Sequence, residues 1–75
     1  MSIADVRLQR DMPFLKVGMK VYSINRKEFG KITGTNRSLN INVKFDGEKH
    51  SVNMHPEWMI RYIDTDGSTI REYLD

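Results

Sequence analysis

The sequence predicts an all-β domain in which five short strands form one small, strongly bent barrel. Between residues 17 and 63, short apolar runs alternate with Gly, Asp-Gly and His-Pro, which are typical of turns between strands. The clearest run, residues 40–45, alternates polar and apolar side chains, the period of a half-buried strand. At 75 residues the chain makes one domain near the lower size limit for independent folding. We expect an N-terminal arm over residues 1–15, the barrel over 16–63 and a C-terminal tail over 64–75.

The arm has the pattern of a short helix. Ile3, Val6 and Arg10 are spaced like one helical face, with Leu8 off it, in a segment that ends before a proline. Isolated helices so short are marginal, so the segment is either a docked arm or a frayed terminus. The apolar residues 13–15 that follow are expected to cover one open end of the barrel.

The first two strands are expected at residues 20–24 and 31–35, joined by a charged loop. Gly30 ends this loop and suits either a positive φ or a close approach of two backbones. Gly34 lies inside the second strand, where it predicts a bulge or sharp bend of the kind that small barrels need in order to close. The segment Asn36-Arg37-Ser38 is typical of a turn.

Residues 40–54 predict a β-hairpin. The strand 40–45 turns its apolar residues to one face, and Asp46-Gly47 follows directly, the dipeptide favoured where both turn residues have positive φ. The return strand over 49–54 then places alternate side chains, His50 among them, beside that apolar face.

A tight turn and a final strand complete the barrel. Pro56 cannot donate in a central strand, so residues 55–59 predict a 3₁₀ turn and residues 60–63 the fifth strand. Another turn opens the tail. Residues 68–74 are then compatible with either a short capped helix or an edge strand.

Composition and motifs argue against several function classes. The chain has no cysteine, so it has neither disulfides nor thiolate metal sites. His50 and His55 would point to opposite faces of one strand, so we expect no metal site. No cofactor motif or activated nucleophile is recognisable, and we expect a non-enzyme that needs no cofactor. No apolar run is long enough to span a bilayer and no signal-peptide pattern opens the chain, so we expect a cytoplasmic protein without a membrane partner.

Charge is unevenly distributed along the chain. Residues 16–61 carry nine Lys and Arg against four Asp and Glu, a net +5, whereas residues 62–75 carry one base against four acids, a net −3. A basic barrel with an acidic tail is compatible with a polyanion partner. A merely solvated mixed surface explains the modest excess equally well.

The order of strand, charged loop, strand, polar turn, tight hairpin, proline turn and strand resembles the SH3-like small barrels over residues 16–63. The opening VGMKVYSINRKEFGKITG also resembles KOW-type and Tudor-like barrels, which occur as accessory modules on ribosomal, transcription and helicase proteins. The resemblance implies a ligand groove between the loop after the first strand and the 3₁₀ turn. In this chain that region contains Tyr22, Arg26, Lys27, Phe29, Trp58 and His55.

The leading hypothesis is a non-enzymatic module that contacts nucleic acid through the Arg26-Lys27 loop and through lysines that alternate outward on adjacent strands. Aromatic rings beside cations are what single-stranded nucleic acid requires. The expected contact residues are Lys20, Tyr22, Arg26, Lys27, Lys31, Lys44 and Trp58. The sequence leaves open whether Trp58 lies in the core or at the surface.

Two other functions are carried as alternatives. One is a protein-interaction or self-assembling barrel with Trp58, Met59 and Tyr62 in its interface. The other rests on Val52-Asn53-Met54-His55-Pro56, which is similar to the Val-Gln-Ile-Tyr-Pro active-site segment of the plasmid-borne type II dihydrofolate reductases. Those are small tetrameric barrels that use NADPH. Asn53, His55 and Ser23 stand where that family has Gln, Tyr and a substrate-binding Lys. The small, cysteine-free format also resembles accessory proteins of phages and mobile elements.

Overall fold

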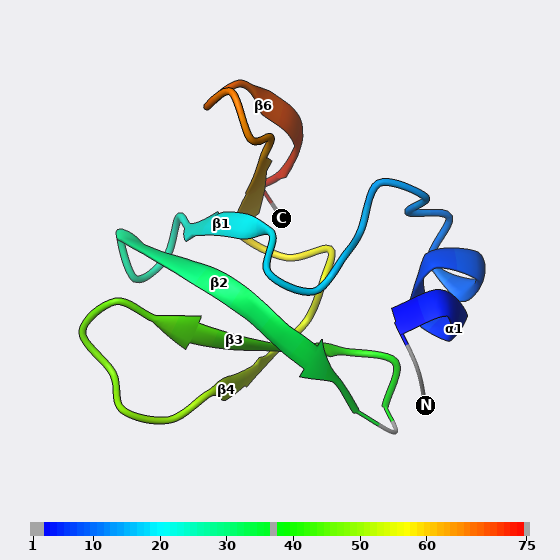
Figure 1. The fold of residues 1–75 in the computed structure, drawn as a ribbon, viewed down its shortest axis with the longest axis horizontal. Helices are drawn as coiled ribbons and strands as arrows, with labels where there is room; N and C mark the ends of the chain where they lie inside the picture. The colour runs from blue at the N-terminus through cyan, green and yellow to red at the C-terminus, as the bar shows by residue number, and fades with distance from the viewer. Residues whose placement is uncertain (1–2, 37, 75) are drawn as a thin grey trace.

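The computed structural model describes residues 3–36 and 38–74. In this part of the chain there are one short helix and six strands, arranged in one sheet of order β4-β3-β2-β1-β5-β6 with every neighbouring pair antiparallel (Figure 1). The elements are α1 (Ile3–Gln9), β1 (Lys20–Ser23), β2 (Glu28–Thr35), β3 (Ile41–Phe45), β4 (Val52–Met54), β5 (Ile60–Ile63) and β6 (Thr69–Tyr73). The predicted all-β class is confirmed.

The prediction of five strands closed into a barrel is wrong. The tail forms β6, which pairs with β5 through Arg61 opposite Glu72 and Tyr62 opposite Arg71, so the edge-strand alternative holds and the helix does not. Within the described residues the sheet is not closed, because β4 and β6 are its two edges. The segment before β5 forms a turn and a bend without a 3₁₀ helix.

The predicted hairpin forms with a longer loop than expected. Val43 of β3 lies opposite Val52 of β4, which puts the apolar faces of both strands together as predicted. Asp46-Gly47 forms a turn, but neither residue has positive φ, and β4 begins only at Val52. His50 therefore lies in the loop and is exposed, so its expected place beside the apolar face is wrong.

Both strand glycines have structural roles. A Cβ on Gly30 would lie 2.8 Å from the carbonyl oxygen of Lys44, so this position requires glycine for a close approach of β2 to β3. The pairing of β2 with β3 shifts between Ile32 and Gly34, and the irregularity that Gly34 predicted is confirmed there.

The core lies between the inner face of the sheet and the N-terminal segment. Its buried side chains are Val6, Met12, Leu15, Met19, Val21, Ile32, Ile41, Val43, Phe45, Ile60 and Tyr62. Val6, Met12 and Leu15 are fully buried although they precede the first strand. Phe14 packs edge-on against Tyr62, with ring centroids 5.2 Å apart. Of the two alternatives for the arm, the docked one is therefore correct.

Arg10 holds the arm in place by polar contacts. Its guanidinium donates to the carbonyl of Leu39 (3.1 Å), to Oδ1 of Asn40 (3.3 Å) and to Oε1 of Glu57 (3.2 Å). These partners belong to the loop between β2 and β3 and to the turn before β5. One half-buried side chain thus ties the N-terminal arm to a loop and a turn that lie far from it along the chain.

Tyr62 predicts a loss of stability at alkaline pH. Burial, followed by repulsion from Tyr73 and Glu57, raises the pKa of the Tyr62 hydroxyl, which donates to the carbonyl of Pro56 (2.6 Å). Since the folded pKa is the higher one, this contribution to stability is complete below the ordinary tyrosine pKa of about 10 and is lost as pH rises above it. Urea unfolding between pH 8 and 11 should show the decline. Tyr62→Phe should flatten it, and an unchanged decline in that variant would contradict the assignment.

Candidate functional site

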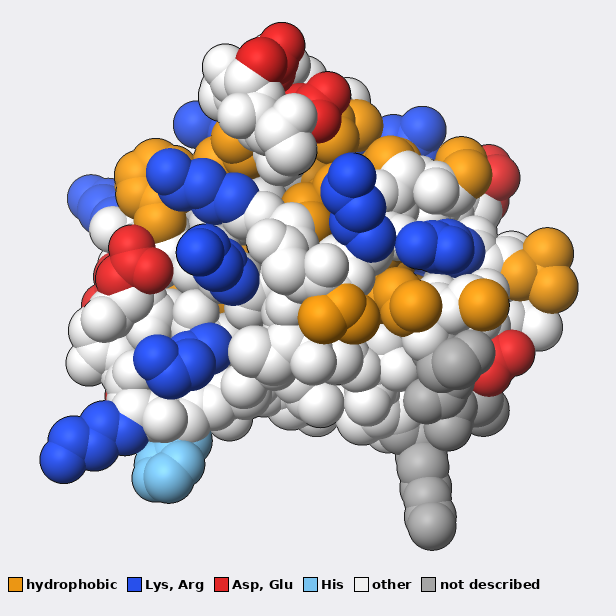
Figure 2. Space-filling model, viewed as in Figure 1, with side chains coloured by type: hydrophobic (Ala, Val, Ile, Leu, Met, Phe, Trp, Pro, Cys, Tyr) orange, Lys and Arg blue, Asp and Glu red, His pale blue; other side chains and the backbone are white. Residues whose placement is uncertain are grey.

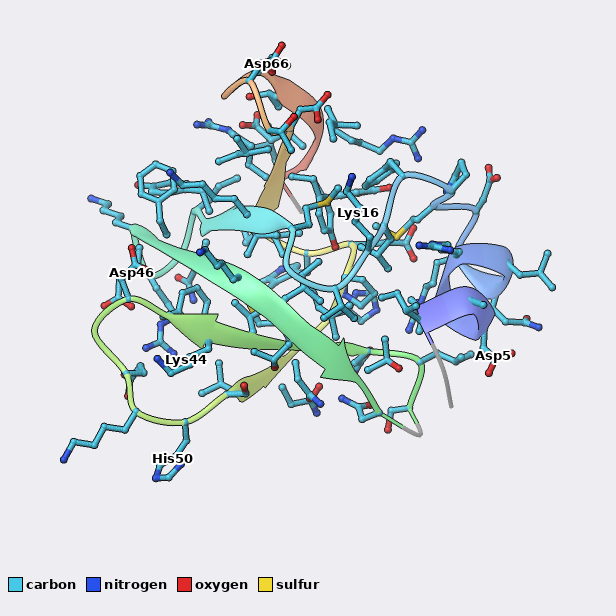
Figure 3. All side chains as sticks on the ribbon, in the orientation of Figure 1. Asp5, Lys16, Lys44, Asp46, His50 and Asp66 are labelled. Carbon is cyan, nitrogen blue, oxygen red and sulfur yellow. The ribbon has the colours of Figure 1, made fainter. Side chains whose placement is uncertain are left out.

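A row of three lysines crosses the outer face of the sheet. Lys20 of β1 lies directly opposite Lys31 of β2, which lies directly opposite Lys44 of β3. All three side chains are exposed, because their neighbours on each strand point into the core. The ion pairs found among residues 3–36 and 38–74 are made by arginines and include none of these lysines. Figure 2 shows several Lys and Arg side chains spread over one face of the molecule, with polar and apolar surface between them, and Figure 3 labels Lys44 beside β3.

An aromatic pair adjoins this row. Tyr22 of β1 lies opposite Phe29 of β2, with ring centroids 4.7 Å apart and planes inclined at 56°. The Nζ of Lys20 lies 4.6 Å from the centre of the Phe29 ring, and the guanidinium of Arg61 lies 5.5 Å from that of Tyr22. Phe29 is 41% exposed, so part of its ring meets solvent. Each ring thus has a cation beside it, and Phe29 also has part of its surface in contact with solvent. The aromatic–lysine face, as we name it, consists of Lys20, Tyr22, Phe29, Lys31, Lys44 and Arg61.

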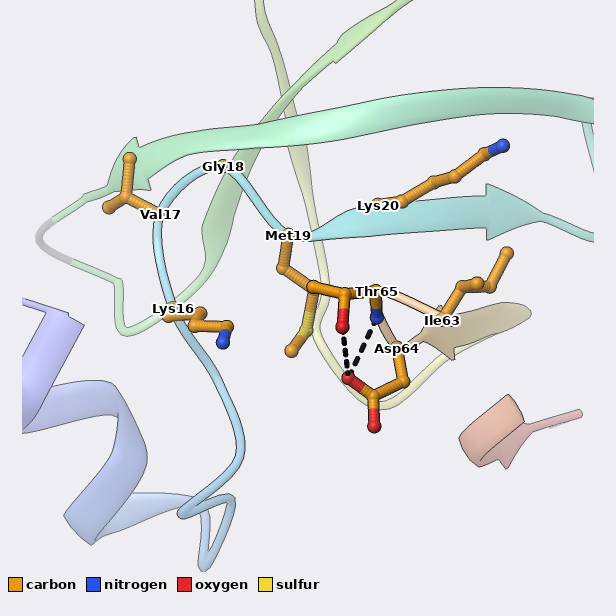
Figure 4. A pocket seen from close by; sticks show the side chains of 8 residues that line it. All are labelled: Lys16, Val17, Gly18, Met19, Lys20, Ile63, Asp64 and Thr65. Atoms are coloured by element: carbon orange, nitrogen blue, oxygen red, sulfur yellow. Dashed lines mark hydrogen bonds between the residues drawn. The ribbon is translucent and has the colours of Figure 1, made fainter. Parts of the chain in front are cut away.

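Two shallow hollows border the aromatic–lysine face where β5 leads into β6. The first, which we name the Phe29 hollow, has a volume of about 320 Å³. It is lined by Lys20, Phe29, Arg61, Ile63, Asp64, Thr65, Gly67 and Thr69. The second, of about 270 Å³, shares Lys20, Ile63, Asp64 and Thr65 with it and continues along residues 16–19 (Figure 4). Asp64 Oδ1 accepts hydrogen bonds from the backbone N–H of Thr65 (2.7 Å) and from its hydroxyl (3.5 Å).

Acidic side chains lie at the margin of this face. Figure 3 places Asp46 in the loop after β3 and Asp66 at the turn between β5 and β6. Hydrogen bonds from the hydroxyl and the backbone N–H of Ser68 hold the pKa of the Asp66 carboxyl below its usual value, so this turn keeps its negative charge.

The other predicted contact residues lie away from the lysine row. Arg26 stacks on Phe45 at 4.3 Å and pairs with Glu48 (2.8 Å) and Glu28 (3.5 Å), so its charge is partly compensated within the protein. Lys27 is exposed in the turn after β1 and has a φ of 59°.

Trp58 is 45% exposed, which decides between the two places that the sequence left open for it. It lines a separate hollow of about 210 Å³ together with Arg26, Met54 and His55. None of the residues that line this hollow also lines the Phe29 hollow. Tyr62, expected in an interface with Trp58, is fully buried, so that expectation is wrong.

Arg61 is the member of the aromatic–lysine face that the sequence did not reveal. Its place over Tyr22 depends on the pairing of β5 with β1, strands that lie far apart along the chain. Arg37, counted in the basic segment and in the predicted turn, lies outside the described residues.

The described residues contain neither a cluster of metal ligands nor a membrane-spanning helix. Among residues 3–36 and 38–74, no group of three or more His, Asp or Glu is placed to hold a metal ion. No helix in these two ranges has the length and apolarity needed to cross a membrane. Comparison of the chain with protein-family models, with curated proteins and with solved structures finds no match.

Proposed function

We propose that the protein is a nucleic-acid-binding module whose contact surface is the aromatic–lysine face. The observation that carries the proposal is the cross-strand row of Lys20, Lys31 and Lys44. Like charges directly opposite one another destabilise an antiparallel pair, so the row lowers the stability of the free protein. A bound polyanion would remove this repulsion and recover that stability through linkage.

The surroundings of the row favour nucleic acid over other polyanions. Tyr22 and Phe29 supply ring faces beside the cations, the combination used in proteins that bind single strands. Arg61 places a guanidinium over the Tyr22 ring, with its charge partly compensated by an ion pair with Glu72. The resemblance of the opening segment, residues 17–34, to KOW-type and Tudor-like barrels supports the same class, although the fold alone does not determine a ligand.

Replacing Lys31 tests the proposal because this lysine faces a lysine on each side. We expect Lys31→Gln to weaken binding of nucleic acid and to reduce the slope of log K against log salt by about 0.7–0.9. The same substitution should raise the free energy of unfolding by about 0.2–1 kcal/mol, since the like-charge pairs disappear. Fluorescence anisotropy across a salt series and urea unfolding measure the two effects.

Lys49→Gln is the matched control for this test. It removes the same charge from an exposed loop residue outside the row. Equal losses of affinity in both variants would show only a net-charge effect and contradict the assigned surface. Failure of the unaltered protein to bind DNA or RNA at about 50 mM salt, where electrostatic binding is strong, would refute the function itself.

A protein-interaction function is the second candidate, and one observation favours it. Trp58 is 45% exposed beside the hollow that Met54 of the edge strand β4 also lines. Exposed tryptophan and an open strand edge are both typical of protein contacts. Sedimentation over a concentration series would reveal self-association. The reductase and mobile-element hypotheses stay predictions.

A further inference from the structure

The Phe29 hollow has the chemistry of a site for one flat, polar-edged ring. Phe29 and Ile63 give it apolar surface, and Lys20 places a cation beside that surface. Arg61 also lines the hollow and is paired with Glu72. Asp64 and Thr65, in the connection after β5, and Thr69 of β6 add hydrogen-bonding groups. Its volume of about 320 Å³ lies at the small end of ligand pockets.

We propose that this hollow is a nucleobase subsite and that the ligand of the aromatic–lysine face is single-stranded nucleic acid. The inference rests on the proposed function and narrows its substrate class. A base would stack on Phe29 and turn its edge toward Asp64, Thr65 and Thr69. The sugar–phosphate backbone would then continue across the strands toward Lys31 and Lys44, which follow Lys20 at strand spacings of about 4.8 Å.

The contact between Lys20 and Phe29 in the free protein is compatible with a base taking the place of the Lys20 ammonium on the ring. In the free protein the ammonium lies 4.6 Å from the ring centre, where an arriving base would stack. Lys20 is exposed, and a cation–π contact at an exposed site is weaker than base–aromatic stacking. A base can therefore displace the ammonium, which is then free to pair with a phosphate.

Single strands fit the hollow better than duplexes do. In a duplex the bases are paired and stacked on one another, so their faces are not available to a ring on the protein surface. In a single-stranded nucleic acid every base has a face that can stack on the Phe29 ring, and such stacking tolerates any sequence. We therefore expect weak sequence preference and a clear preference for single strands.

The test compares three probes on the full chain at low salt. They are a labelled single-stranded oligothymidylate of about ten nucleotides, a duplex of the same length, and linear polyphosphate, which has the charge without the bases. Phe29→Leu should weaken binding of the oligothymidylate about tenfold, within the roughly 5- to 150-fold range that loss of one stacked base produces. It should leave polyphosphate binding unchanged, and Phe29→Trp should retain binding of the oligothymidylate.

Two further variants separate this inference from the proposed function. Lys31→Gln should weaken binding of both the oligothymidylate and polyphosphate, whereas Trp58→Leu, in the separate hollow, should change neither. If Lys31→Gln weakens binding and folded Phe29→Leu does not, the base subsite is refuted and the nucleic-acid function stands. Equal weakening of polyphosphate by Phe29→Leu, or tighter binding of the duplex than of the single strand, also refutes the subsite. If the unaltered protein binds a proline-rich peptide and neither nucleic-acid probe, both proposals fail.

Discussion

Replacing Leu15 with alanine is expected to unfold most of the protein at room temperature. Leu15 is fully buried. Truncating a buried leucine to alanine lowers the free energy of unfolding by about 2–5 kcal/mol. A chain of this size without disulfides rarely has more than about 3–5 kcal/mol of stability in total. Circular dichroism during urea or thermal unfolding would measure the loss.

Leu8→Ala is the control within the same arm. Leu8 is 78% exposed, so the same change of side chain should alter the free energy of unfolding by no more than about 0.5 kcal/mol. If Leu15→Ala unfolds no more easily than Leu8→Ala, the arm is not part of the core. Arg10 provides the same link by polar contacts to Leu39, Asn40 and Glu57.

The arm shows what local patterns determine and what they do not. The spacing of Ile3, Val6 and Arg10 correctly predicts which side of α1 faces the protein. It cannot distinguish a docked helix from a frayed one, since docking depends on a cavity built by strands elsewhere in the chain. Leu15 and Met12 are also fully buried and dock the arm against the sheet. A helix as short as α1 would be marginal without this packing.

The main error in the fold concerns the C-terminal tail, which forms a sixth strand. Residues 60–63 are predicted as the fifth strand and form β5. The tail has no comparable pattern, because every residue from Thr69 to Glu72 in β6 is exposed and the period-2 signal needs one buried face. Its pairing with β5 across the short turn at residues 64–68 makes β6 one edge of the open sheet. Similarly, Asp46-Gly47 marks a turn correctly, but the loop length that sets the register is not fixed by that dipeptide.

The candidate site could be predicted only in part, because local patterns give the face of a strand on which a side chain lies but not the register between strands. Alternation along each strand places Lys20, Lys31 and Lys44 on the outer side, where they lie. Their alignment in one row depends on the register of β1, β2 and β3, which the structure supplies. The resemblance to SH3-like barrels directed attention to Arg26 and Trp58, which lie together in another hollow.

Gly30 joins the fold to the lysine row, and replacing it with alanine is expected to cost about 1–3 kcal/mol of stability. The new Cβ would lie 2.8 Å from the backbone oxygen of Lys44 and 2.9 Å from Cγ1 of Val43, so β3 would have to move away from β2. That movement changes the spacing of Lys31 and Lys44, so nucleic-acid affinity should fall together with stability. Unfolding and anisotropy measurements on one preparation would test both.

Gly34→Ala is the matched substitution in the same strand. No atom lies within 4 Å of its added Cβ and φ is not positive there, so alanine should be tolerated. It should stabilise the protein by about 0.4–1 kcal/mol, because alanine restricts the unfolded chain more than glycine does. Loss of stability at Gly34 as large as at Gly30 would mean that strand flexibility, and not the close approach of β2 to β3, explains both glycines. Retained affinity in a destabilised Gly30→Ala protein would show that binding does not depend on the spacing of the row, and would leave net charge as its cause.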